Sequence, residues 1–188
     1  MPMPISRRLF FALLCACGLA VQATAQSPTT VVIIVRHAEK GTAPANDPPL
    51  TDAGVARAKA LAAVLAGANV QSVISTPLVR TRETARPTAE ARGLTIETVA
   101  LGPVPDHAKA VADAVRKHAG QTVLVVGHSN TVAAIIAALG GPRLPDLCDS
   151  QYSNLYTLVL DGNTTRLILG SYGTVSPDAA TGCPNPMK

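Results

Sequence analysis

Aromatic residues are scarce in this chain of 188 residues: they make up 3% of it, as three Tyr and two Phe, and Trp is absent. Proteins that hold single-stranded nucleic acid stack its bases on aromatic side chains, so this scarcity argues against a nucleic-acid partner. Charged residues are also few, at 15%, against 47% hydrophobic ones, which excludes a disordered polar chain. The length suits one compact domain.

The first 25 residues have the pattern of a secretory signal. Arg7 and Arg8 precede an apolar stretch over residues 9–21, and Ala23-Thr24-Ala25 forms a small-x-small cleavage site. The apolar stretch is shorter than the roughly 18 residues of a membrane span. We therefore expect cleavage after Ala25, a single domain over residues 26–188, a periplasmic or secreted location and no stable membrane insertion. A lipoprotein signal around Cys15 and Cys17 is the less favoured alternative.

Removal of this signal changes the charge and the cysteine count. The mature 163 residues lack Arg7 and Arg8, so the formal net charge falls from +4 to +2, which does not indicate a polyanion binder. Of four cysteines, Cys148 and Cys183 remain. In an exported protein they are predicted to form a disulfide, with two unpaired thiols as the alternative. The sequence indicates no metal site and leaves the oligomeric state open.

Apolar strands alternate with amphipathic helices along most of the mature chain. This alternation predicts an α/β domain with a largely parallel sheet. Pro87 is expected to kink the second helix or end it early. The expected strands cover residues 31–35, 73–75, 94–99 and 122–126, a hairpin joins 155–160 to 165–169, and the expected helices cover 51–66, 77–92, 106–119 and 129–139.

Two of the four histidines directly follow strongly apolar strands. Arg36-His37 follows the strand at 31–35, and His128 follows the strand at 122–126. The carboxyl ends of parallel strands meet at one rim of a sheet, and Arg80 in the first turn of the second helix should face the same rim. Arginine binds phosphate oxygens with planar paired donors, and nearby positive charge keeps a histidine neutral and nucleophilic. These residues predict a site for a phosphoryl group.

Four segments together resemble the histidine phosphatase superfamily, also called phosphoglycerate-mutase-like. They are R-H-A-E-K at 36–40, L-T-D-A-G at 50–54, S-T-P-L-V-R-T-R-E-T-A at 75–85 and G-H-S-N-T at 127–131. The resemblance implies a three-layer α/β sandwich with a mostly parallel central sheet. It further implies that His37 attacks phosphorus and that Arg36, Arg80 and His128 hold the phosphoryl oxygens. Water would then release phosphate, with no metal and no cofactor.

The acid that protonates the leaving group is less clearly marked. Glu83, Glu97 and Asp106 are the candidates, and we select Asp106, which could equally cap the following helix. Thr51 and Gly54 are expected to cap and shape the first helix. Glu39 and Lys40 are expected to be solvated loop charges, with a position at the border of the pocket as the alternative.

The favoured activity is hydrolysis of phosphomonoesters, with a small-molecule or envelope-linked phosphorylated substrate. A phosphoglycerate mutase fits poorly because its substrates are cytosolic, whereas this chain is expected to be exported. The alternatives are a phosphohistidine protein phosphatase and a non-catalytic anion-binding module of the same fold.

Overall fold

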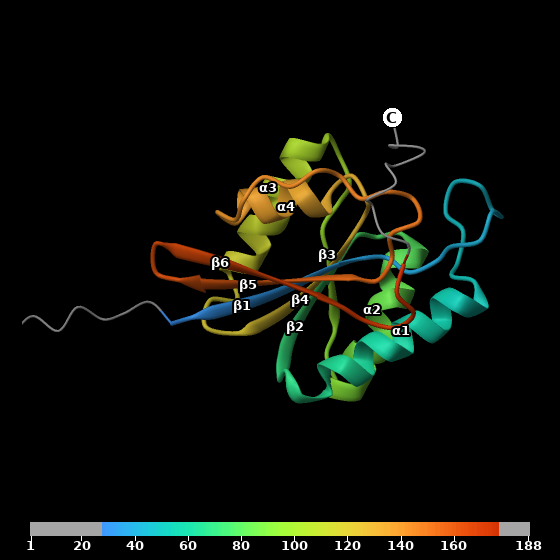
Figure 1. Cartoon of the computed structure of the whole chain (residues 1–188), viewed down its shortest axis with the longest axis horizontal. Helices are drawn as coiled ribbons and strands as arrows, with labels where there is room; N and C mark the ends of the chain where they lie inside the picture. The colour runs from blue at the N-terminus through green and yellow to red at the C-terminus, as the bar shows by residue number, and fades with distance from the viewer. Residues whose placement is uncertain (1–27, 177–188) are drawn as a thin grey trace, which may run out of the picture.

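The computed structural model describes residues 28–176, which form a six-stranded sheet between two pairs of helices (Figure 1). The strands are β1 (Thr30–Arg36), β2 (Val70–Ser75), β3 (Ile96–Thr98), β4 (Thr122–Gly127), β5 (Asn154–Asp161) and β6 (Thr164–Ser171). The helices are α1 (Asp52–Val64), α2 (Val79–Arg92), α3 (Val104–Arg116) and α4 (Val132–Ala138), with a short 3₁₀ turn η1 (Leu65–Gly67) after α1.

The sheet has the order β3-β2-β4-β1-β5-β6. The pairings β3–β2, β2–β4 and β4–β1 are parallel, whereas β5 and β6 are added antiparallel. Helices α1 and α2 cover one face and α3 and α4 the other, which confirms the predicted three-layer α/β sandwich (Figure 1). The hairpin β5–β6 was also predicted correctly.

The two central strands, β4 and β1, are buried on both faces because they consist almost entirely of branched apolar residues. Val32 and Ile34 belong to the core under α3 and α4, whereas Ile33 and Val35 belong to the core under α1 and α2. The alternation of these side chains along β1 therefore ties both helical layers to one strand.

Helix α1 begins as predicted, because the Thr51 side chain accepts a hydrogen bond from the Gly54 amide at 3.2 Å. Gly54 also shapes the contact with the chain after β1. A Cβ placed there would lie 2.1 Å from the Glu39 carbonyl oxygen, which no other residue could tolerate without a backbone shift. The roles expected of Thr51 and Gly54 are thus confirmed.

Helix α2 differs from the expectation. It begins at Val79 rather than at Pro77, and it continues through Pro87 to Arg92. Thr84, Ala85, Thr88 and Ala89 are all buried around this proline, so packing of the helix against the rest of the fold outweighs the missing backbone donor.

Helices α3 and α4 also differ at their first residues. Helix α3 begins at Val104, so Asp106 lies within its first turn and is not its cap. Helix α4 begins at Val132 and is shorter than predicted, because residues 129–131 form a turn.

Two predictions involve residues outside the described part of the chain. The export signal over residues 1–25 lies wholly outside it, and so does Cys183, whereas Cys148 is described and buried. The signal, the periplasmic or secreted location and the Cys148–Cys183 disulfide therefore stay predictions. Within residues 28–176, the helices are all too short or too polar to cross a membrane.

Candidate functional site

The two histidines predicted at the rim lie side by side because their strands are neighbours. Arg36 pairs with Gly127 in the parallel register of β1 and β4, and the His37 amide donates to the Gly127 carbonyl at 2.9 Å. The ring centroids of His37 and His128 are 5.4 Å apart and edge-to-face, with an interplanar angle of 63°. The predicted meeting of the two strand ends is therefore observed.

His37 is held as a neutral imidazole with a defined tautomer. Its Nδ1 lies 2.8 Å from the Ala38 carbonyl oxygen, which can only accept, so the ring proton is on Nδ1. The Nε2 lone pair is therefore available for attack on an electrophile. Burial lowers the pKa of His37 to about 2, and the charges of Arg36 and Arg80 act in the same direction.

Ala38 itself is fixed from α2. Its amide donates to the Thr84 hydroxyl at 2.9 Å, and that hydroxyl donates to the Arg80 carbonyl at 2.8 Å. The peptide that orients the nucleophile is thus connected to the helix that carries Arg80.

His128 is also buried and neutral. Its Nε2 lies 3.1 Å from the hydroxyl of Thr76, the residue that follows β2, and Thr76 in turn contacts the Thr81 hydroxyl at 2.8 Å. Burial, followed by the charge of Arg80, lowers the pKa of His128 to about 3. The residues around β2 therefore set the orientation of the second histidine.

The guanidinium of Arg36 is held by hydrogen bonds to the loop before β5. One nitrogen donates to the carbonyls of Cys148 and Asp149 at 2.8 and 3.0 Å, and the group lies 4.1 Å from the centre of the Tyr152 ring. The Asp149 carboxylate is 3.5 Å away. The Nε of Arg36 is buried and makes no hydrogen bond to any residue in the described part of the chain.

Arg80 is held from the Pro-rich loop after β1. Its guanidinium lies 3.6 Å from the carboxylate of Asp47, which also accepts from the Val79 amide at 2.9 Å. The Nε of Arg80 is likewise buried without a hydrogen-bond partner within residues 28–176. Two arginines thus each keep a buried donor that no described residue accepts from.

Arg36, His37, Arg80 and His128 all line one cavity of about 250 Å³. Four of the five predicted site residues are therefore brought together. The remaining lining residues are Lys40, Leu78, Leu101, Gly102, Val104, Asn130 and Thr131.

The fifth predicted residue lies elsewhere. Asp106 is exposed in the first turn of α3 and is not among the residues that line the cavity. Glu83 accepts from the Leu50 amide at 2.8 Å, and Glu97 lies 2.9 Å from His118. Proton donation by Asp106 stays a prediction, and its observed position does not support it.

Several residues of the site were missed or misjudged from the sequence. Asp47 and Tyr152 hold the arginines through contacts that no local pattern signals. Glu39 was expected to be solvated, but it forms an ion pair with buried Arg57 at 2.8 Å. Lys40 is exposed, as expected, and it also lines the cavity, which was the alternative.

The geometry suits a phosphoryl group better than a metal ion. Within residues 28–176, the His, Cys, Asp and Glu side chains do not gather in threes or more in a way that could hold a metal. A neutral histidine and two arginines that line one cavity are instead the groups that an electrophilic, anionic group requires.

Comparison with protein families also points to a protein that acts on phosphoryl groups. The sequence model of the histidine phosphatase superfamily (branch 1) matches residues 32–100, a span that includes Arg36, His37 and Arg80. The resemblance predicted from the sequence is therefore confirmed over this span, which ends before His128.

Solved structures share the histidine phosphatase fold. YhfR of Bacillus stearothermophilus is 20% identical with a TM-score of 0.60, over 74% of this chain and 96% of that one. A mycobacterial glucosyl-3-phosphoglycerate phosphatase is 18% identical with a TM-score of 0.60, over 77% and 98%. The protein histidine phosphatase SixA, complexed with tungstate, is 20% identical with a TM-score of 0.59, over 75% and 96%. No curated protein matches this sequence.

Proposed function

We propose that this protein is a phosphatase that hydrolyses phosphomonoesters through a phosphohistidine at His37, without a metal. The observation that carries the proposal is the 2.8 Å contact of His37 Nδ1 with the Ala38 carbonyl, which leaves the Nε2 lone pair free at the cavity. The family and the functions named for the similar structures support the same class of reaction.

The first step forms a bond between His37 Nε2 and phosphorus and breaks the bond between phosphorus and the ester oxygen. The leaving oxygen takes a proton from solvent or from an acid. Charge that develops on the phosphoryl oxygens is stabilised by Arg36 and Arg80, whose buried Nε groups have no hydrogen-bond partner within residues 28–176. His128 contributes a further ring next to the nucleophile.

The second step returns His37 to its starting state. The oxygen of a water molecule attacks phosphorus, the N–P bond breaks and inorganic phosphate leaves, while the water gives its proton to solvent. Nε2 regains its lone pair, and Nδ1 keeps its proton throughout because the Ala38 carbonyl holds it.

Replacement of the nucleophile tests this proposal. His37→Asn is expected to lower kcat for p-nitrophenyl phosphate by about 10³-fold or more, since it removes the group that forms the covalent intermediate. The matched control is His118→Asn, which removes the histidine that contacts Glu97 on another part of the fold. A labelled phosphodonor should leave an acid-labile, alkali-stable label on wild type and on the control only.

Three results would contradict the proposal. Turnover by His37→Asn at the wild-type rate would exclude His37 as nucleophile. Loss of activity on treatment with a chelator would indicate a metal. Binding of phosphate without hydrolysis of any phosphoester would instead identify a non-catalytic anion-binding module.

A phosphohistidine protein phosphatase is the second candidate. It is favoured by the positions of Glu83, Glu97 and Asp106, each of which lies outside the cavity lining. Imidazole, with a pKa near 6.5, leaves with far less help from an acid than an alcohol does. A phosphohistidine peptide should then exceed an alkyl phosphate in kcat/KM by about 10²-fold or more, and equal values would reject this candidate.

A further inference from the structure

Lys40 is a second cationic feature of the cavity, separate from the groups that surround the phosphoryl position. Its backbone is fixed where the loop after β1 returns, because Lys40 forms an antiparallel bridge with Leu50 and the Gly41 amide donates to the Pro49 carbonyl at 2.8 Å. Its side chain lines the same cavity as His37 and Arg80. Lys40 is therefore a lysine with an anchored main chain at the site.

The acidic residues near the cavity are committed to other cations. Glu39 is bound by Arg57, and its carboxylate receives three hydrogen bonds of 2.8–2.9 Å from that guanidinium. The carboxylates of Asp47 and Asp149 lie beside Arg80 and Arg36. Lys40, in contrast, forms no ion pair and no side-chain hydrogen bond within the described part of the chain.

Lys40 and His37 also differ in depth. His37 is 3% exposed at the floor of the cavity, whereas Lys40 is exposed at its mouth. The lining is partly apolar, with Leu78, Leu101 and Val104. A bound phosphoester would place its phosphoryl group at the floor, its carbon portion along this apolar lining and its far end near Lys40.

We propose that Lys40 selects phosphorylated substrates whose organic part carries a second anionic group, either a carboxylate or another phosphate. An ammonium without an internal counter-ion gains a charge-assisted hydrogen bond from such a group, whereas a neutral substrate leaves it solvated. The inference rests on the proposed function, because it takes the phosphoryl group to be bound beside His37. The proposal adds a preference for a second anionic group, which His37 and the two arginines do not impose.

Binding of two phosphonates tests the role of Lys40. Phenylphosphonate and 4-carboxyphenylphosphonate cannot be hydrolysed, so their Kd values report recognition alone, by titration calorimetry at low salt. Wild type is expected to prefer the carboxylated compound by about 10-fold, in line with one charged hydrogen bond that is partly exposed. Lys40→Gln should reduce this preference to below about 2-fold, and Lys40→Arg should retain it.

Lys59→Gln is the matched control, since it removes an exposed lysine of α1 that lines a different cavity, and it should keep the wild-type preference. A thermal melt of each variant checks that it is folded. Equal affinity of wild type for both compounds, or an unchanged preference in Lys40→Gln, would overturn the role of Lys40 alone. Failure of wild type to bind either compound would overturn the phosphoryl site as well, whereas binding without hydrolysis of any ester would overturn only the catalytic proposal.

Discussion

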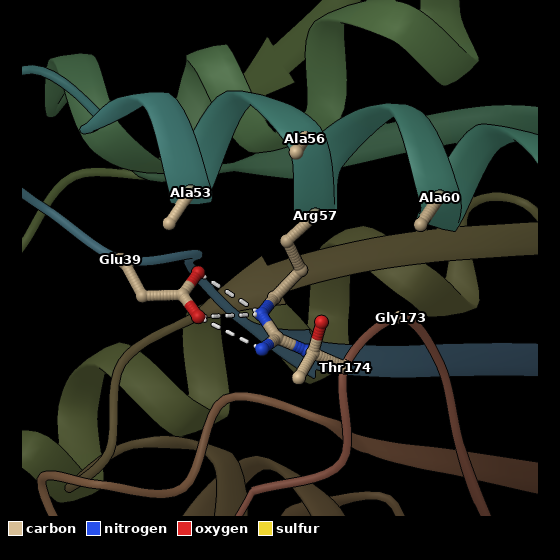
Figure 2. Close-up of a pocket in the computed structure, with 7 residues that line it drawn as sticks. All are labelled: Glu39, Ala53, Ala56, Arg57, Ala60, Gly173 and Thr174. Carbon is tan, nitrogen blue, oxygen red and sulfur yellow. Dashed lines mark hydrogen bonds and ion pairs between the residues drawn. The ribbon is translucent and has the colours of Figure 1, made fainter.

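Two cavities of similar volume are both lined in part by the segment that follows β1, and they differ in how their charges are arranged. One, of about 270 Å³, is lined by Ala53, Ala56 and Ala60 of α1 together with the Glu39–Arg57 pair (Figure 2). The other, of about 250 Å³, is lined by His37, Arg36 and Arg80 among others. Their volumes alone would not tell them apart.

In the first cavity the charged groups satisfy one another. Figure 2 shows the Arg57 side chain reaching from α1 to the Glu39 carboxylate. A further nitrogen of Arg57 donates to the Tyr172 carbonyl at 3.0 Å, so the pair joins α1, the segment after β1 and the segment after β6. Although burial raises the pKa of Glu39, hydrogen bonds and charge from Arg57 hold it below its ordinary value.

In the second cavity each arginine also lies beside a carboxylate, Asp149 for Arg36 and Asp47 for Arg80, but the pairing is incomplete. Arg36 and Arg80 each retain a buried Nε donor with no partner within residues 28–176, and burial lowers the pKa of both arginines. Leaving buried donors unpaired costs stability, and an anionic ligand that accepted from them would offset that cost. The two cavities therefore differ not in volume but in whether every guanidinium nitrogen finds a partner within residues 28–176.

Removal of an arginine from each cavity sharpens this comparison, and the largest effect is expected at Arg80. Arg80→Ala should lower kcat/KM for p-nitrophenyl phosphate by about 10²–10³-fold, because it deletes a donor that acts on the charge of the transition state. The free energy of unfolding should change by less than about 1 kcal/mol, since Arg80 contacts its carboxylate at only 3.6 Å. Steady-state kinetics and urea unfolding measure the two quantities, and a large loss of stability with little loss of rate would break the comparison.

Arg57→Ala should show the opposite pattern. It leaves Glu39 partly buried without its partner and removes the donor to the Tyr172 carbonyl, so the free energy of unfolding should fall by about 2–4 kcal/mol. The activity of the folded fraction should fall much less than in Arg80→Ala. Urea unfolding at pH 7, with Arg82→Ala on the exposed side of α2 as the control, measures the loss. A change below about 0.5 kcal/mol would show that the pair is not structural.

The smallest effect concerns pH. His128 has a pKa of about 3 in the folded protein, against an ordinary value of 6.5, so the unfolded chain binds its proton first as the pH falls. Stability from this group is therefore complete above about pH 6.5 and declines toward pH 3. His128→Asn should reduce the slope of unfolding free energy between pH 6 and pH 4 by about 1 kcal/mol per pH unit.

Urea unfolding at several pH values gives this slope for wild type and for the variant. His37→Asn should reduce it in the same direction, because the pKa of His37 is lowered to about 2. Identical slopes in all three proteins would mean that neither histidine is buried neutral.

The sequence predicted the parts of the fold that follow from local pattern. The apolar runs of β1 and β4 identify strands buried on both faces, and the Thr51 cap marks where α1 begins. Because Arg36, His37 and His128 directly follow these strands, their meeting follows from the parallel arrangement alone. Arg80 was found in the same way, from its place at the start of a helix after β2.

The errors arise where packing or distant contacts decide the structure. Pro87 does not end α2 because buried residues flank it. Arg57 of α1 is buried although it is charged. Its ion-pair partner, Glu39, lies 18 residues away in the sequence. No local pattern around Arg57 therefore predicts that it is buried.

The contacts that complete the site span still greater distances. Asp47 and Val79 are 32 residues apart, and Arg36 reaches carbonyls more than 110 residues further along the chain. Such pairs have no periodic signature in a single sequence. The same limit explains the choice of Asp106, which was placed near the rim by its position after a strand but is exposed on α3.

The hydrogen bonds that hold the Arg36 guanidinium have a consequence for the evolution of this sequence. The nearest acceptors of the guanidinium are the main-chain carbonyls of Cys148 and Asp149, and every amino acid supplies the same carbonyl. Substitutions at these two positions can therefore accumulate without loss of the contact, provided that the backbone keeps its path. Among proteins that descend from this one, the backbone conformation of this loop should be conserved more strongly than its amino-acid sequence.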